Sequence, residues 1–191
     1  MFKDLVKANR SCRGYDETYR MTKEELLDFV DHARLTPSGI NAQPFKYYLA
    51  WKQDQVQQIL PHTKWAGLLS HLKLPHEGMN PTGFIVICQD LNIQKSLVKH
   101  QKDMGVVAQT ILLAATEKKL GGCIINNISA TSLKKALELD EHLMPVLVIA
   151  LGKPQEKVIL TEVENGGSTK YYRDEFDVHY VPKRKLEDII I

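Results

Sequence analysis

The sequence predicts an α+β fold, a layered arrangement of helices and strands, on three observations. Helical patterns alternate irregularly with short apolar runs of strand length. No βαβ unit repeats, so a doubly wound parallel sheet is not favoured. Hydrophobic residues make up 43% and charged residues 25% of the 191 residues, as in ordinary globular chains. We therefore expect residues 1–191 to form a single domain.

Two helices are predicted before the first strand. A short helix over residues 2–9 has its apolar side chains on one face. A second helix starts after Thr22, because Glu25 follows three residues later and completes a capping box. We expect Pro37 to end this helix, since the residue before a proline is pushed out of the helical region.

Three strands are predicted from apolar and aromatic runs. Residues 45–51 are rich in aromatic side chains, and residues 84–88 and 146–151 are almost continuously apolar. The run at 84–88 is expected to be buried on both faces of its sheet. A short helix is expected over residues 53–60, followed by an irregular stretch at 62–82.

The helix predicted for residues 104–119 is apolar almost all round, which places it in the interior. Gly121 is expected to take a left-handed conformation and cap this helix. A brief extended piece at 124–125 and a helix opened by Ser129 or Thr131 follow.

Beyond residue 154 the periodicity fails. Residues 155–178 are expected to run over a surface, and residues 181–191 are first basic and then apolar. This C-terminal arm, residues 155–191, has little core of its own. Laying it across a partner subunit would stabilise it, which favours a homodimer.

Composition and charge exclude several classes of protein. Lys and Arg number 25 against 23 Asp and Glu, a net charge of +2 that does not indicate a nucleic-acid partner. The apolar runs are too short to span a membrane. Seven scattered histidines and three cysteines without a CxxC pair indicate no metal and no disulfide framework, and reduced thiols favour the cytoplasm.

The first candidate site is the basic segment that contains Arg10, Ser11 and Arg13. Guanidinium groups offer forked, permanently charged donors that suit a phosphate. A solvated basic turn is the simpler interpretation on composition alone. Cys12, between the two arginines, is expected to have a lowered pKa.

The second candidate is the proline-bracketed loop that contains Pro37, Ser38, Gly39, Asn41 and Gln43. Its two amide side chains each supply a donor and an acceptor, which suits the mixed edge of a heterocycle. An ordinary loop between a helix and a strand is the alternative.

The third candidate is the backbone of Gly122, Cys123 and Ile124, where few side-chain atoms would obstruct a ligand. Simple helix capping would also explain the glycines. Cys123 is expected to pack as a small apolar residue, since no histidine and acid accompany it.

The fourth candidate is the basic run Lys183, Arg184 and Lys185. Taken alone, this run is typical of a solvated tail.

In this order and spacing, the four segments resemble the FMN-dependent nitroreductase family. The resemblance covers nearly the whole chain. It rests on an Arg-Arg-Ser-x-Arg motif at 9–13, Pro-Ser-x-x-Asn-x-Gln-Pro at 37–44, a central helix with Asp103 and a Leu-Gly-x-Cys-like turn at 120–123, Leu-Gly-x-Pro at 151–154, and a basic stretch before Leu-Glu-Asp-Ile at 186–189. Asn9 departs from the motif, because many members have an arginine there.

The resemblance implies that FMN is the cofactor. Its phosphate would meet Arg10, Ser11 and one or two of the three basic residues at 183–185. Arg13 would lie near flavin N1 and O2, where a cation raises the reduction potential. Asn41 and Gln43 would approach from the partner subunit.

The fold implied by the resemblance is a central antiparallel sheet wrapped by helices, with the C-terminal arm exchanged across a homodimer. The backbone at 122–124 would lie against flavin N5 and O4. The implied activity is a ping-pong reaction in which NADH or NADPH reduces the flavin, and a nitroaromatic, a quinone or a related small-molecule acceptor reoxidises it. No catalytic side chain is needed, because the flavin carries the chemistry.

Alternative functions stay open at this stage. One is a non-catalytic FMN-binding or sensing protein, and another is a specialised flavin enzyme of the same fold. A basic-tailed domain without any cofactor is the alternative that leaves four ordered motifs to chance.

Overall fold

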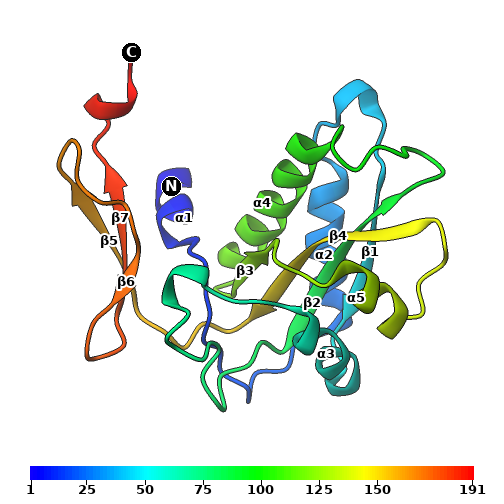
Figure 1. Ribbon diagram of the computed structural model, residues 1–191, viewed down its shortest axis with the longest axis horizontal. Coiled ribbons are helices and arrows are strands. Elements are labelled where there is room, and N and C mark those ends of the chain that lie inside the picture. Colours follow the sequence, from blue (N-terminus) through cyan, green and yellow to red (C-terminus); the bar gives the residue numbers. More distant parts are fainter.

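The computed structural model describes residues 1–191 and has a four-stranded sheet between two layers of helices (Figure 1). The strands lie in the order β1 (Phe45–Ala50), β2 (Gly83–Asp90), β4 (Leu143–Gly152) and β3 (Gly121–Ile125). Every neighbouring pair in this sheet is antiparallel. The predicted central antiparallel sheet is therefore confirmed.

The helices are α1 (Phe2–Ala8), α2 (Lys23–Arg34), α3 (Gln53–Ile59), α4 (Gln101–Glu117) and α5 (Ala130–Ala136). Short 3-10 turns are η1 (Gly39–Asn41), η2 (Leu60–His62), η3 (Gly67–Leu69) and η4 (Glu187–Ile189). None of the helices combines the length and the apolar character that a bilayer crossing requires.

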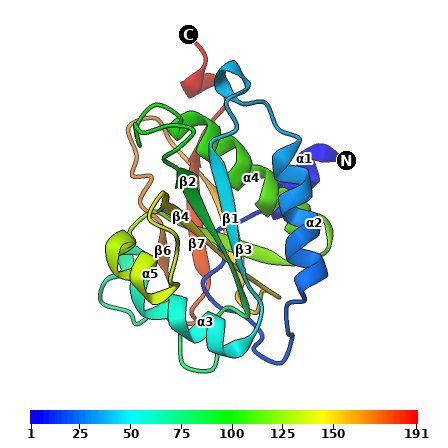
Figure 2. The same cartoon turned by 90° about the vertical axis from the view of Figure 1, so that its right-hand side faces the viewer.

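The sheet separates two hydrophobic cores because its side chains alternate between two faces. In β2, Ile85 and Ile87 join the core formed with α2 and α4, whereas Phe84 and Val86 join the core formed with α3 and α5. Figure 2 shows the sheet between these helix pairs. All eight residues of β2 are buried, so the prediction of a strand buried on both faces is confirmed.

The capping box of α2 is also confirmed. The backbone N–H of Glu25 donates to the Thr22 hydroxyl at 3.2 Å, and the backbone N–H of Thr22 donates to the Glu25 carboxylate at 2.8 Å. The helix ends at Arg34 and not at Pro37. Its last backbone groups are satisfied by a tight turn, in which the N–H of Leu35 donates to the carbonyl of His32.

Helix α4 buries one long face against the sheet and α2, but Val106 on another face is 43% exposed, so the prediction of an interior helix is confirmed for that face only. Its buried residues are Val107, Ala108, Ile111, Leu112, Ala114 and Ala115. The expected glycine cap is wrong, because Lys119, with φ of 61°, takes the left-handed conformation. Gly121 instead begins β3, where an added Cβ would lie 2.7 Å from the Pro154 ring.

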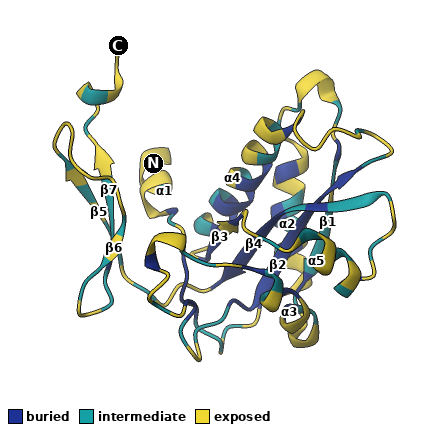
Figure 3. Ribbon diagram, in the orientation of Figure 1, coloured by how far each residue is buried: buried dark blue, intermediate teal, exposed yellow.

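Helix α1 has no buried residue, and Phe2 is 71% exposed. Figure 3 shows α1 as mostly exposed, in contrast to the dark central strands. The apolar face predicted for this helix is thus uncovered in a single chain.

Residues 155–178 lie at the surface as expected, but they contain strands that the loss of periodicity did not predict. The arm forms a second sheet from β5 (Val158–Val163), β7 (His179–Arg184) and β6 (Tyr172–Arg173), in that order. Strands β5 and β7 are parallel, and β6 and β7 are antiparallel. Figure 1 shows this sheet beside α1, apart from the central sheet. Its exchange across a dimer stays a prediction.

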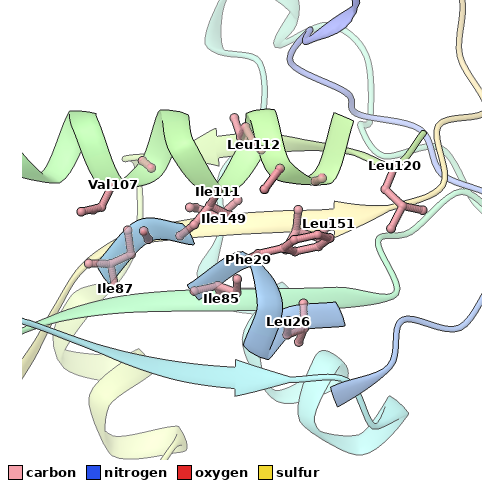
Figure 4. Close-up of a cluster of buried hydrophobic side chains, with 14 of the residues drawn as sticks. Leu26, Phe29, Ile85, Ile87, Val107, Ile111, Leu112, Leu120, Ile149 and Leu151 are labelled. Carbon is pink, nitrogen blue, oxygen red and sulfur yellow. The ribbon is translucent and has the colours of Figure 1, made fainter. Parts of the chain in front are cut away.

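Replacing Phe29 by alanine is expected to lower the free energy of unfolding by about 3–5 kcal/mol, since a large cavity would form in the core. Phe29 is fully buried and lies among Ile85, Ile149 and Leu151 (Figure 4). Leu27→Ala on the same helix is the control, because Leu27 is 48% exposed and should cost less than about 1 kcal/mol. Urea denaturation measures both, and equal losses would contradict the assignment of this core.

Candidate functional site

The N-terminal segment and the arm meet around a cavity of about 310 Å³. Side chains from five parts of the chain surround it: the segment after α1, α4, β3, the loop before β6, and β7. They are Asn9, Arg10, Ser11, Arg13, Gln109, Leu112, Ile124, Tyr171, His179, Val181 and Lys183. The structure thus brings together the first and the fourth candidate segments.

The N-terminal segment lies along the free edge of the central sheet. Ser11 pairs with Gly122 of β3 as an isolated parallel bridge, and the N–H of Cys12 donates to the Gly122 carbonyl at 2.9 Å. Tyr15, fully buried, donates its hydroxyl to the Cys12 carbonyl at 2.6 Å. These contacts fix the segment from which Arg10 and Arg13 line the cavity.

Glu156 fixes the base of the arm to the same segment. Its carboxylate accepts the backbone N–H of Arg13 at 2.6 Å and pairs with Arg173 of β6. The side chains of Glu156 and Arg173 are only 2% and 3% exposed. Arg173 also donates to Asp177 at 2.8 Å. The arm therefore has a defined position beside the cavity in this chain.

The cavity is lined by three cations and no acid. Arg10 donates to the Val6 carbonyl at 2.8 Å but has no carboxylate partner, and burial lowers its pKa. Arg13 is 9% exposed and also lacks an ion pair. The Nε atoms of both arginines are buried without a hydrogen-bond partner. Burying unpaired cations is costly, so an anionic ligand would stabilise this arrangement.

Successive side chains of β7 point to opposite faces of the strand, and this alternation determines which residue of the basic run 183–185 lines the cavity. His179, Val181 and Lys183 line the cavity, one from every second position. Arg184 follows on the opposite face of the strand. Lys185 is paired with Glu164 at 2.7 Å. Of the three basic residues predicted to meet a phosphate, the structure therefore places only Lys183 at the cavity.

Strand β3 contributes a side chain where backbone was expected. Ile124 lines the cavity, whereas Cys123 points into the core on the other face of the sheet. The carbonyl of Gly122 is engaged by Cys12, and an added Cβ on Gly122 would lie 2.4 Å from the Ala150 carbonyl. Close packing between strands therefore explains this glycine.

The predicted lowering of the Cys12 pKa is wrong. The thiol is buried, and this burial raises its pKa, with the negative charge of Glu156 as a second cause. The two flanking arginines do not compensate, because the backbone bridge to β3 turns Cys12 into the core. All three cysteines are free and buried.

The proline-bracketed loop lies at the other end of α4. Asp103, in the first turn of α4, accepts the Ser38 hydroxyl and the Gly39 N–H, each at 2.8 Å. Asn9 is bonded to Thr116 at the last turn, at 2.9 Å. Thirteen residues of helix separate these two anchors, which corresponds to roughly 20 Å. Within one chain, the second candidate segment is therefore separate from the cavity.

Asp103 holds this loop in a disfavoured backbone conformation. Ile40, Asn41 and Gln43 all have positive φ, at 50°, 54° and 46°. Such strain persists only where surrounding contacts enforce it. The Gln43 amide donates to the Asn41 side chain at 3.0 Å, so the two predicted amides form a single unit. Pro37, Ser38 and Gln43 line a second cavity of about 200 Å³ with Asp103.

Sequence reasoning missed five residues of the first cavity: the apolar Leu112 and Val181, and the polar or aromatic Gln109, Tyr171 and His179. The guanidinium of Arg13 lies 5.2 Å from the centre of the Tyr171 ring, and this ring lies 5.3 Å from the imidazole of His179. Side chains on one face of a strand recur at every second residue, so counting back from Lys183 in steps of two would have found His179. Gln109 and Tyr171 carry no signal in the sequence.

The layered fold is that of a known class. The chain belongs to the Nitroreductase family, whose family model matches residues 6–74 and 82–153.

Two relatives illustrate the similarity in sequence. A Methanothermobacter thermautotrophicus protein, provisionally named NADH dehydrogenase/NAD(P)H nitroreductase, is 25% identical over 158 residues, which cover 80% of this chain and 77% of the relative. YodC of Bacillus subtilis, provisionally named an NAD(P)H nitroreductase, is 22% identical over 177 residues, covering 78% and 88%.

Solved structures show the same fold. A nitroreductase family protein from Streptococcus pneumoniae TIGR4 matches with a TM-score of 0.68 at 16% identity, covering 100% of this chain and 99% of that chain. A provisionally assigned nitroreductase from Exiguobacterium sibiricum 255-15, in complex with FMN, matches with a TM-score of 0.67 at 18% identity, covering 82% and 89%.

Asp103→Asn is expected to lower the free energy of unfolding by about 1–3 kcal/mol at pH 7, because hydrogen bonds to a charged group are lost. The bond with His100, supported by those from Gly39 and Ser38, lowers the pKa of Asp103. Its contribution is therefore present above the ordinary carboxyl pKa near 4 and is lost as the pH falls through the lower folded value.

Denaturation of both proteins between pH 7 and pH 2 measures this effect. The difference between wild type and Asp103→Asn should shrink below about pH 4. Asp54→Asn is the control, because Asp54 is exposed and its side chain makes no hydrogen bond or ion pair. A difference that is constant with pH would contradict the role of the carboxylate.

Proposed function

We propose that the chain is an FMN-dependent oxidoreductase that uses NADH or NADPH to reduce nitroaromatics, quinones or a related acceptor, as a homodimer in the cytoplasm. The observation that carries the proposal is the cavity with three unpaired cations and no acid. Family membership, the names of the relatives and the FMN complex of a structural neighbour support it. Free, buried thiols suit a reducing compartment.

The residues of the cavity fit the chemistry of FMN. Arg10 and Lys183, from opposite ends of the chain, supply two cations for a phosphate dianion. The Ser11 hydroxyl lines the same cavity and can donate to a phosphate oxygen. Leu112, Ile124 and Val181 offer apolar surface for a flat ring system. The two buried Nε donors without partners, on Arg10 and Arg13, are satisfied if an anionic ligand enters.

A second subunit would complete this site. The loop of Asn41 and Gln43 is anchored at the far end of α4, so we propose that it reaches the cofactor of the partner. The uncovered apolar face of α1 and the exposed apolar residues of the arm, such as Ile189, are surfaces that such an assembly would cover. The arm, residues 155–191, would then contact the partner subunit. Residues 1–191 would together form a single FMN-binding domain.

FMN, when bound, would supply the redox chemistry by taking hydride at N5 and passing it to the acceptor in a ping-pong sequence. The protein's own task is binding, orientation and electrostatics. Arg13 holds a positive charge in a nearly buried position, where it would stabilise a reduced, negatively charged ring. Leu112 and Ile124 line the same cavity and would shield a bound ring from water. No catalytic side chain is assigned.

Anaerobic mixing tests the activity. We expect protein reconstituted with FMN to lose its yellow absorbance rapidly with NADH or NADPH, and to regain it when a nitro compound or a quinone is added. Stopped-flow spectroscopy with both nicotinamides and a panel of acceptors measures the two half-reactions. A protein that binds FMN but stays oxidised would instead be a binding or sensing module, and failure to bind FMN would refute the cofactor.

Lys183→Ala should weaken FMN binding by about 10- to 100-fold, because a charge-assisted contact to phosphate is lost. Lys185→Ala is the matched control two residues away, and it should change the affinity less than about threefold, since its ammonium is paired with Glu164. Fluorescence quenching of FMN measures both dissociation constants. A larger effect of Lys185→Ala would show that the arm adopts a different register around the phosphate.

A further inference from the structure

His179 is buried at the contact between the arm and the N-terminal segment. It is 1% exposed, and it lines the same cavity as Arg10, Arg13 and Lys183. Its Nε2 atom lies 3.3 Å from Nη1 of Arg13. Neither the family motifs nor the charge pattern of the sequence includes this residue.

The chemistry of the pair determines the state of the imidazole. A guanidinium can only donate, so Nε2 of His179 must accept and the ring proton must be on Nδ1. The charged groups that affect the pKa of the imidazole are Arg13 from the N-terminal segment, Arg173 from β6, and Asp177 from the turn before β7, and the Tyr171 ring packs against it at 5.3 Å. Burial first, and then the two guanidiniums, lower the pKa of His179 to about 4. The ring is therefore neutral at physiological pH.

Arg13 has few other restraints on its guanidinium group. Nη1 donates to the Ser11 carbonyl at 3.3 Å, and the Tyr171 ring lies beneath the group at 5.2 Å. No carboxylate pairs with it, because Glu156 engages the backbone N–H of Arg13 and not its side chain. The imidazole is thus the only side-chain hydrogen-bond acceptor that Arg13 has.

We infer that His179 is a positioning residue, whose neutral imidazole accepts a hydrogen bond from Arg13 and holds the guanidinium, stacked on Tyr171, where it meets the bound flavin. The inference rests on the proposed function, because it assigns the Arg13 charge to FMN. It adds a residue of the arm to the control of an N-terminal cation. Loss of the acceptor would leave Arg13 free to rotate away from the ligand.

The test compares variants that keep or remove an acceptor at the position of Nε2. His179→Gln can place its amide oxygen there, whereas His179→Leu keeps the bulk and has no acceptor. We expect His179→Leu to weaken FMN binding about tenfold and to lower the flavin midpoint potential, and His179→Gln to stay within about threefold of wild type. His142→Leu is the control, because it makes the same change at a histidine that lines a different cavity.

A double-mutant cycle distinguishes positioning from a general structural role. In an Arg13→Met background, replacing His179 by leucine should cause no further loss of FMN affinity, since the two residues act through one contact. Equal losses for the leucine and glutamine variants, no loss for leucine, or an undiminished loss in the Arg13→Met background would each overturn the inference. If His179→Leu does not fold, His179→Asn replaces it, because its shorter amide cannot reach the position of Nε2.

Wild-type protein separates this inference from the proposed function. Failure of wild type to bind FMN refutes the cofactor itself. A second readout needs no cofactor: in NMR spectra of the FMN-free protein, the Arg13 side-chain N–H signals should show hindered rotation in wild type and His179→Gln, and free rotation in His179→Leu. Signals that do not differ between these proteins would overturn the positioning role, whatever the affinity for FMN.

Discussion

Glu156 connects the two ends of the chain through one carboxylate. One oxygen accepts the backbone N–H of Arg13, and the other pairs with Arg173, in surroundings that leave both side chains almost fully buried. Removing either partner would strand a charge away from water, which costs far more than the pair itself contributes. Because the arm is held by this contact, His179 and Lys183 face the cavity, and the unpaired cations gather there.

The distribution of charge explains why this cavity differs from the rest of the surface. Elsewhere, Lys118, Lys153 and Lys185 are paired with carboxylates, and most other lysines are exposed to water, whereas Arg13 is unpaired and nearly buried. At the cavity, the side chains of Arg10 and Arg13 donate hydrogen bonds only to backbone carbonyls and to one imidazole. A neutral histidine is compatible with such a site, whereas an acid would neutralise the field that attracts a phosphate.

The central layers could be predicted from the sequence because their signals are local. The apolar run of β2 is buried on both faces, and the capping box at Thr22 needs only four consecutive residues. The arm could not be predicted in the same way. Strand β7 pairs in parallel with β5, about twenty residues earlier, and the alternation of both strands is masked by polar side chains that stay partly exposed. The tight turn at Lys119 was missed because glycine is the usual residue there.

The candidate site, like the fold, has parts that local sequence signals predict and parts that depend on the tertiary structure. Arg10, Arg13 and the basic run were found because charge clusters are visible in a sequence, but the choice of Lys183 needed the register of β7. A single histidine or tyrosine in a polar segment has no pattern, so His179 and Tyr171 emerged only from the fold. The position of the Pro37–Gln43 loop depends on the length of α4, and no local motif encodes that distance.

The bridges of the N-terminal segment also bear on biosynthesis. Ser11 pairs with Gly122, Tyr15 with Pro154, and the Arg13 backbone with Glu156, all of which are translated more than a hundred residues later. A nascent chain emerges from its N-terminus, so these pairings cannot form until the helices and the sheet between have been made. The cation-lined cavity can therefore arise only in the last stage of folding, after residues up to Lys183 have left the ribosome.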